Sequence, residues 1–161
     1  MPTLIRPATP DDAGLVFDFV MKLAEYENLT HEVDATAEGI ADALFRPDPK
    51  AFCDLAFRDG EPAGFALWFY NFSTFRGRHG IYLEDLFVEP KFRGLGIGRA
   101  LLERLAARCV AEGLARFEWS VLDWNAPSIA FYRSLGAVPK DEWTMFQVSD
   151  AALARLGGGG R

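Results

Sequence analysis

The stretch from Leu83 to Arg99 constrains the fold of this chain more than any other. An apolar run, Leu83–Val88, predicts a strand, and a short turn leads from it to Arg93–Arg99, which holds three alternate glycines. Apolar residues that recur every four positions after Ile97 predict a helix starting there. The first N–H groups of a helix lack internal partners and carry the positive end of its dipole, so they attract anions. Because glycine leaves the backbone bare at that point, the segment predicts a cradle for a phosphate-bearing cofactor.

Other glycine motifs fit this segment less well. A P-loop ends in Gly-Lys-Ser or Gly-Lys-Thr, whereas Gly98 is followed by Arg99 and Ala100. A dinucleotide-binding fingerprint needs a third glycine where this chain has Arg99, and it opens a βαβ unit rather than lying past the middle of a chain. A glycine-rich turn that binds nothing is the remaining alternative.

The pattern Arg-x-x-Gly-x-Gly, at Arg93, Gly96 and Gly98, resembles the signature of the GCN5-related N-acetyltransferase (GNAT) superfamily. Further segments are similar to its diamine (spermidine/spermine, thialysine) N-acetyltransferase branch, and the resemblance spans nearly the whole chain: Ile5–Thr9, Leu23–Glu27, Tyr82–Asp85 and Trp124–Ala137. It implies an α/β fold, with a central, mostly antiparallel mixed sheet, a splayed parallel strand pair and flanking helices. It also implies acetyl-coenzyme A as cosubstrate and no metal.

The resemblance assigns coenzyme binding to the strand, the glycine loop and a later helix. The residues are Leu86, Phe87, Val88, Arg93, Gly94, Leu95, Gly96, Ile97, Gly98, Arg99, Asn125, Ser128 and Tyr132. Tyr132 matches the tyrosine that lies beside the coenzyme sulfur and is the candidate general acid; the alternative is an ordinary packed aromatic residue. Asn125 stands seven residues earlier, on the same helix face, and could cap that helix, contact the pantetheine or acceptor, or do both.

Two adjacent carboxylates interrupt the apolar strand, at Glu84 and Asp85. A primary amine has a pKa of about 10.4 and arrives protonated, so it must lose a proton before it attacks a thioester. Buried carboxylates are expensive without a use, and in a regular strand neighbours point to opposite faces. By resemblance, Glu84 deprotonates the amine through water and Asp85 holds its cationic end. The alternative is a pair at a strand end neutralised by Lys or Arg.

The first predicted helix ends in Glu25, Tyr26 and Glu27, which are further candidates for acceptor binding. Two acids at the negative end of a helix dipole are locally unfavourable, which hints at a cationic ligand; a solvated helix end is the alternative. In the polyamine enzymes of this branch, Glu25 corresponds to a lysine and Ala126 to an acid. The identity of the acceptor is therefore open.

The remaining chain predicts interleaved helices and strands, with residues 1–156 as a single domain and residues 157–161 as a flexible glycine-rich tail. Strands are expected at 3–6, 51–57, 63–72, 117–122 and 142–148, and helices from Pro10 to about Glu27, over 35–45, from Ile97 to Glu112 and from Asn125 to Gly136.

Composition limits the possible partners. A chain of 161 residues, half of them hydrophobic, can bury a sizeable core. Its net charge of -6 argues against nucleic acid and suits a small cationic amine. Cys53 and Cys109 are expected as reduced core residues, and the lack of a targeting peptide or long apolar span predicts a cytoplasmic protein without a membrane partner.

The combined interpretation is an N-acetyltransferase that acts on a small di- or polyamine, or on an amine-bearing amino acid such as thialysine, without an acyl-enzyme. Enzymes of this branch are typically homodimers, and the aromatic residues Trp143 and Phe146 could serve an interface or the core. One alternative is an enzyme for another amine, such as an antibiotic, a protein terminus or a different amino acid. The other is a coenzyme-binding sensor without turnover.

Overall fold

The computed structural model describes residues 2–159, and their contacts divide them into two compact units that meet between Ser120 and Val121. The N-terminal unit contains β1 (Thr3–Pro7), η1 (Pro10–Asp12), α1 (Ala13–Glu27), η2 (Thr30–Glu32), α2 (Ala37–Phe45), β2 (Phe52–Arg58), β3 (Glu61–Ser73), β4 (Arg78–Val88), η3 (Pro90–Phe92), α3 (Ile97–Glu112) and β5 (Phe117–Trp119). The C-terminal unit contains α4 (Ala126–Ser134), α5 (Asp150–Ala154) and η4 (Arg155–Gly159).

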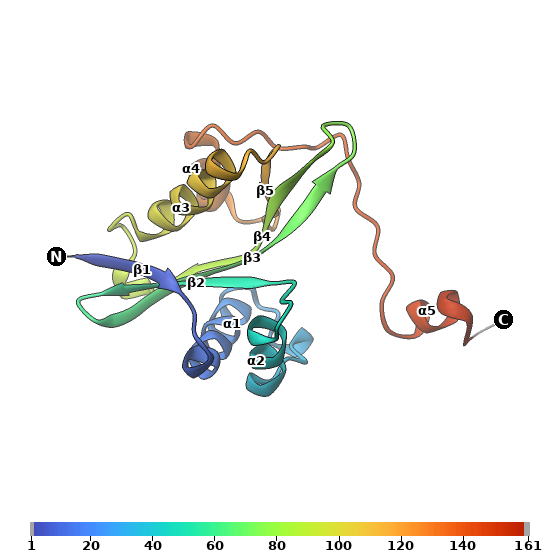
Figure 1. The fold of residues 1–161 in the computed structure, drawn as a ribbon, viewed down its shortest axis with the longest axis horizontal. Coiled ribbons are helices and arrows are strands. Elements are labelled where there is room, and N and C mark those ends of the chain that lie inside the picture. Colours follow the sequence, from blue (N-terminus) through green and yellow to red (C-terminus); the bar gives the residue numbers. More distant parts are fainter. Residues whose placement is uncertain (1, 160–161) are drawn as a thin grey trace. The chain divides into compact units, whose positions relative to one another are not determined.

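The N-terminal unit is built on one mixed sheet in the order β1-β2-β3-β4-β5. The first four strands pair antiparallel, and β4 and β5 run parallel. Helix α1 covers one face with α2 beside it, and α3 covers the other (Figure 1). The predicted fold class, a mixed sheet with one parallel pair flanked by helices, is confirmed.

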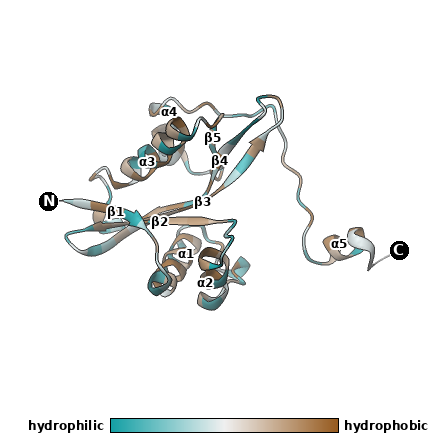
Figure 2. Cartoon of the chain, viewed as in Figure 1, coloured by the Kyte–Doolittle hydropathy of each residue, from teal (hydrophilic) through white to brown (hydrophobic). Residues whose placement is uncertain are grey.

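The core between α1 and the sheet is aromatic. Phe19 is 1% exposed; its ring stacks on Phe65 at a centroid distance of 5.4 Å and meets the edge of Phe87 at 6.1 Å. Val16, one helical turn earlier, is fully buried in the same cluster, as the helical spacing of apolar residues in α1 predicts. Figure 2 shows the hydrophobic residues of α1 beside the hydrophobic strand β2.

Helix α3 buries one stripe of residues against the opposite face of the sheet. Ile97, Leu101, Leu105 and Cys109 are all less than 9% exposed, so the four-residue spacing seen in the sequence is confirmed. Gly113 ends the helix in the left-handed conformation. The expectation of reduced cysteines is also confirmed, since Cys53 and Cys109 are both buried and free.

One predicted strand is wrong. Residues 142–148 form no strand, and the side chains of Trp143, Met145 and Phe146 are more than 70% exposed. The sequence has the alternation of a strand, but a strand also needs a neighbour to satisfy its backbone, and no described strand pairs with this segment. Strand β5 is shorter than predicted and stops at Trp119.

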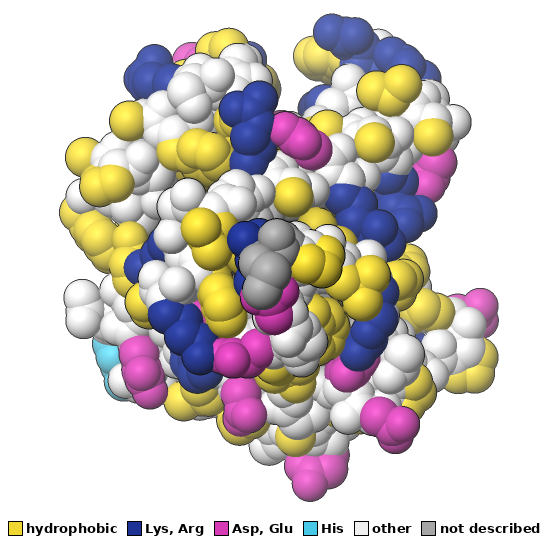
Figure 3. Space-filling view, turned by 90° about the vertical axis from the view of Figure 1, so that its left-hand side faces the viewer, with side chains coloured by type: hydrophobic (Ala, Val, Ile, Leu, Met, Phe, Trp, Pro, Cys, Tyr) yellow, Lys and Arg dark blue, Asp and Glu magenta, His cyan; other side chains and the backbone are white. Residues whose placement is uncertain are grey.

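The other boundaries of the fold lie close to the predicted ones. The predicted glycine-rich tail falls partly in η4, which reaches Gly159, and residues 160–161 lie outside the described part. The single-domain assignment stays a prediction. Figure 3 shows acidic side chains mostly in the lower half of its view, with basic and hydrophobic side chains scattered among them. Among the described residues, no helix is both long and apolar enough to cross a membrane.

Candidate active site

The segment after β4 adopts the predicted cradle geometry. Strand β4 ends at Val88, the turn η3 follows, and α3 begins at Ile97. Gly94 and Gly96 have φ values of 80° and 82°, in the left-handed region that side chains disfavour, and Gly96 is the N-cap of α3. A Cβ atom at either glycine would have no neighbour within 4 Å, so the space beside the loop is open. The loop therefore presents bare backbone at the N-terminus of a 16-residue helix, which is what a phosphate group requires.

The side chains around the cradle have different roles. Ile97 is 2% exposed and belongs to the core, so it can offer a ligand only its backbone. Arg99 donates from Nε to Glu103 at 2.6 Å on the surface of α3. Leu95 is half exposed at the tip of the loop. The predicted coenzyme residues of β4 and α3 thus lie in adjoining elements of one unit.

Arg93 makes contacts that the sequence did not reveal. Its Nε donates to the carbonyl oxygen of Val88 at 2.9 Å. Its guanidinium carbon lies 5.2 Å from the ring centroid of Tyr26 and 5.4 Å from that of Phe87, within cation–π range. Arg93 therefore connects the glycine loop to the last turn of α1. The only sequence signal for this contact is that both residues lie in segments that resemble the same family.

Strand β4 is irregular where the two acids stand. Asp85 is opposite Leu67 on β3, but Leu83 is opposite Trp68, the next residue of β3, so Glu84 occupies a β-bulge. The expectation of opposite faces assumed a regular strand and does not apply at Glu84. Pairing of β4 with β5 also ends at Leu83, so among the described strands β4 continues to Val88 without a neighbour on that side. The predicted parallel pair is confirmed, and it ends beside the bulge because β5 stops at Trp119; the predicted splay of the two strands stays a prediction.

Three carboxylates gather at this bulge: Glu27, Glu84 and Asp85, here called the acidic cluster. Burial, followed by the charges of Glu84 and Glu27, raises the pKa of Asp85 to about 7. Burial also raises the pKa of Glu27. Asp85 pairs with Leu67, which packs against the core on the α1 side, so Asp85 faces α1. Glu84 and Glu25 are exposed. The structure therefore brings together three of the five predicted acceptor residues, and Tyr26 contacts Arg93 instead.

The C-terminal unit holds the remaining site residues on α4. The side chain of Asn125, 6% exposed, accepts a hydrogen bond from the Ser128 backbone N–H at 3.4 Å, and Pro127 stands in the first turn. This confirms the N-cap role of Asn125; its contact with coenzyme stays a prediction. Tyr132 is half-buried two turns further along α4, and its ring centroid lies 5.7 Å from that of Phe131. Gly136, with a φ of 92°, lies just beyond the helix end.

Removal of the Asn125 cap gives a modest, measurable effect. Asn125→Ala is expected to lower the free energy of unfolding by about 1 kcal/mol, because the Ser128 N–H loses its acceptor in a part-buried position. Asn125→Asp and Asn125→Ser, which also cap helices, should retain most of that stability in urea unfolding. Equal loss in all three variants would mean that the amide makes a contact other than the cap.

The fold places a glycine loop with open backbone and an acidic cluster on the same strand, β4, and comparison with known proteins identifies the class of the protein. Residues 16–137 match the acetyltransferase (GNAT) family. The chain is 34% identical to the thialysine N-epsilon-acetyltransferase of Sus scrofa, over 96% of this chain and 97% of that protein. It is 35% identical to the enzyme of the same name from Caenorhabditis elegans, over 94% and 95%.

A solved structure supports the fold alone. An integron cassette protein from the mobile metagenome of V. cholerae aligns with a TM-score of 0.81 and 24% identity, over 98% of this chain and 99% of that one.

The family match and the two relatives show that the chain belongs to the GNAT family and is an N-acetyltransferase.

Proposed function

We propose that this enzyme transfers the acetyl group of acetyl-coenzyme A to a primary amine of a small di- or polyamine, or of an amine-bearing amino acid such as thialysine. The amine would attack the thioester directly. The observation that carries this proposal is the acidic cluster at the bulge of β4, the same strand that leads into the glycine loop. One strand thus supports a site for a cation and a site for a phosphate.

The residues of the cradle fit the coenzyme. GNAT enzymes use acetyl-coenzyme A, and its pyrophosphate requires bare N–H groups and open space, which Gly94 and Gly96 supply. Bound there, the coenzyme would provide an acetyl group activated as a thioester. Beyond Leu83, no described strand pairs with β4 on the β5 side, so backbone groups on that side could hold an extended pantetheine arm.

The acidic cluster suits a cationic acceptor. Asp85 is half-buried with two carboxylates nearby, so its ionised form is disfavoured until a cation binds. An ammonium group at this point would offset the repulsion between the carboxylates. The site should therefore bind acceptors that carry a second positive charge more tightly. The name of the thialysine enzymes points to acceptors of this kind.

Proton movements are assigned to two side chains. Glu84, exposed at the bulge, would take a proton from the acceptor ammonium through water, and the Tyr132 hydroxyl would give a proton to the departing thiolate. Direct attack is supported by the state of the cysteines: burial raises the pKa values of Cys53 and Cys109, which keeps both thiols protonated and poor nucleophiles.

The test is a panel of amines with acetyl-coenzyme A, following the release of free thiol. Putrescine, spermidine, spermine, thialysine and lysine are compared with a monoamine of similar length. We expect release with one of the first five and little with the monoamine. Release only with an antibiotic or a peptide terminus would favour another amine class, and tight coenzyme binding without release for any amine would favour a sensor.

Two single-methyl variants test the glycine loop. Gly96→Ala is expected to weaken acetyl-coenzyme A binding about tenfold. Alanine with a positive φ costs about 1–2 kcal/mol, so the loop is expected to change its conformation and turn its N–H groups away from the pyrophosphate. Gly14→Ala is the matched control, because Gly14 lies in α1, outside the cradle, without a positive φ, and its methyl would have no neighbour within 4 Å. Calorimetry that finds equal coenzyme affinity in both variants would contradict the proposed loop conformation.

A homodimer and a cytoplasmic location are also proposed. Trp143, Met145 and Phe146 leave an apolar surface that a second copy could cover. Two buried free cysteines suit a reducing compartment. Sedimentation at increasing concentration, with Phe146→Asp as a variant that should dissociate the dimer, tests the assembly.

A further inference from the structure

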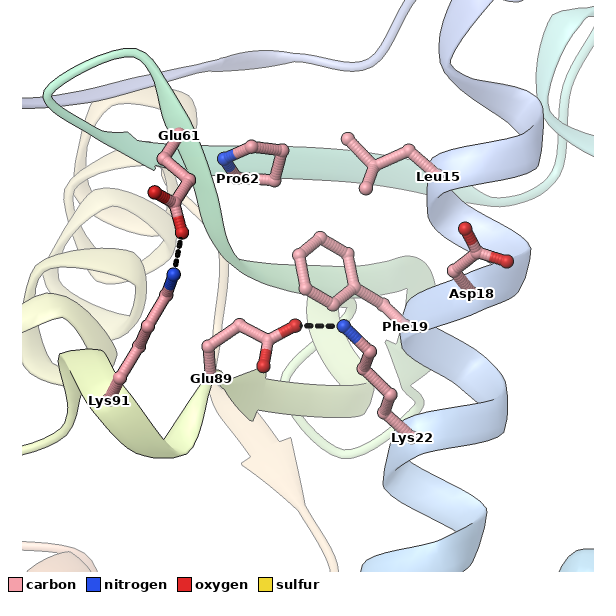
Figure 4. Close-up of a pocket in the computed structure, with 8 residues that line it drawn as sticks. All are labelled: Leu15, Asp18, Phe19, Lys22, Glu61, Pro62, Glu89 and Lys91. Atoms are coloured by element: carbon pink, nitrogen blue, oxygen red, sulfur yellow. Dashed lines mark hydrogen bonds and ion pairs between the residues drawn. The ribbon is translucent and has the colours of Figure 1, made fainter.

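Two contacts join α1 to the residues that lead into the glycine loop. We call these residues, Glu89–Arg93, the lead-in segment. Lys22 of α1 forms an ion pair with Glu89 (Figure 4), and Tyr26 of α1 lies under the guanidinium of Arg93. Lys22 and Tyr26 are four residues apart and share one face of α1, and their partners are also four residues apart. The two contacts therefore act on both ends of the lead-in segment.

Arg93 can connect the position of the glycine loop to that of α1, because its side chain has contacts on three sides. The Val88 carbonyl oxygen accepts a hydrogen bond from Arg93 Nε at 2.9 Å, and the centroid of the Phe87 ring lies 5.4 Å from the guanidinium carbon. A movement of the glycine loop therefore moves the Arg93 side chain against Tyr26. Tyr26 is followed by Glu27, a member of the acidic cluster, so the same movement reaches the proposed acceptor site.

The packing between α1 and the lead-in segment is not continuous. A cavity of about 270 Å³ lies between them, lined by Leu15, Phe19, Pro62, Lys22, Glu89 and Lys91 among others (Figure 4). Across this space the two elements meet through side chains rather than through a close-packed core. A few discrete contacts thus determine how the lead-in segment sits against α1, and the segment has room to shift.

We propose that the Lys22–Glu89 and Tyr26–Arg93 contacts couple coenzyme binding to acceptor binding, with Arg93 and Lys22 as positioning residues. This inference rests on the proposed function of the site. A phosphate group in the cradle fixes the glycine loop and the lead-in segment. Through Arg93 and Tyr26 that order reaches the end of α1 and holds Glu27 in its position beside Asp85. By thermodynamic linkage the acceptor strengthens coenzyme binding by the same factor.

The coupling factor is measured by calorimetry, as the ratio of the Kd of the best panel amine without and with saturating free coenzyme A. Coenzyme A carries no acetyl group, so no transfer disturbs the titration. We expect a factor of about five or more in the natural protein, the lower end of usual coupling. Lys22→Gln, Tyr26→Leu and Arg93→Leu should each bring the factor toward one. The Tyr26→Leu/Arg93→Leu double variant should lose no more than either single variant, because both remove one contact.

Two variants control for general damage. Glu61→Gln removes the ion pair that ties Lys91 to β3 rather than to α1, so it should leave the factor unchanged. Arg93→Lys retains a cation over the rings and should keep part of the factor. Lys22 is 48% exposed and lies outside the catalytic and ligand-binding residues. If Arg93→Leu does not fold, the coupling factor of Lys22→Gln therefore tests the proposal.

The outcomes separate the two proposals. A natural protein that binds neither coenzyme nor amine overturns the proposed function, and this inference with it. A natural protein that acetylates amines with a coupling factor near one, or a Lys22→Gln and Tyr26→Leu pair that keeps the full factor, overturns the inference alone.

Discussion

Replacement of Tyr132 by phenylalanine is expected to lower kcat about 100-fold or more at neutral pH, the usual loss when a general acid is removed. The variant removes one oxygen from a half-buried ring and leaves the cap at Asn125 and the turn at Gly136 in place. The KM for acetyl-coenzyme A should change little. Stopped-flow measurement of thiol release gives the rate, and thermal unfolding checks that the variant is folded at the assay temperature.

A comparison of thioesters makes this test specific for proton donation. A leaving group derived from a more acidic thiol needs less help, so the loss in Tyr132→Phe should shrink with such an acyl donor. Phe131→Leu changes the neighbouring ring without removing a hydroxyl and serves as the control. A kcat within a few-fold of the natural protein for both acyl donors would exclude Tyr132 as the acid.

Replacement of Asp85 by asparagine is expected to stabilise the protein at pH 8 while weakening acceptor binding. The pKa of Asp85 is about 7 in the folded protein, mainly because of burial, and about 3.9 in an unfolded chain. Between about pH 4 and 7 the folded protein therefore holds a proton that the unfolded chain has released, so stability falls as pH rises through this window. Asparagine cannot ionise and avoids this loss, which amounts to up to about 4 kcal/mol above pH 7.

Urea unfolding at pH 5 and pH 8 tests this directly, because the advantage of Asp85→Asn should grow with pH. The control is Asp54→Asn. Asp54 is 3% exposed, and its Oδ2 lies 3.5 Å from Arg104 Nε in an ion pair, so its loss should destabilise by leaving a half-buried charge alone. An Asp85→Asn variant less stable than the natural protein at pH 8 would mean that Asp85 has a favourable partner.

Acceptor binding should depend on pH in the opposite sense. An ammonium group binds the ionised form of Asp85, so the amine KM of the natural protein should fall as pH rises through about 7. In Asp85→Asn the amine KM should be higher and should lose this step. An identical pH profile in both proteins would remove Asp85 from the acceptor site.

Local signals allowed the backbone geometry of the glycine loop and the helix cap at Asn125 to be predicted from the sequence. Gly94 and Gly96 are needed because the backbone has a positive φ at both positions. Glycine adopts this conformation readily, so the residue type itself indicates it. The cap at Asn125 and the buried stripe of α3 depend on contacts within one helix or on one regular spacing, and both were predicted correctly.

Features that depend on distant partners could not be predicted in the same way. The bulge at Glu84 arises from the register between β3 and β4, which the residues of β4 alone do not determine. The contact of Arg93 with Tyr26 joins residues far apart in the chain. The segment at residues 142–148 has strand periodicity, but whether it pairs depends on an available edge rather than on its own residues.

The most direct measurement follows the acetyl group itself. The protein, in excess over acetyl-coenzyme A labelled in the acetyl group, is denatured at short times before and after addition of the best panel amine, and the label is located. Direct transfer predicts that the label stays on the coenzyme until the amine is added and then moves to the amine in one step, without appearing on the protein. Label bound covalently to the protein before the amine arrives, or label that never leaves the coenzyme for any amine, would contradict it.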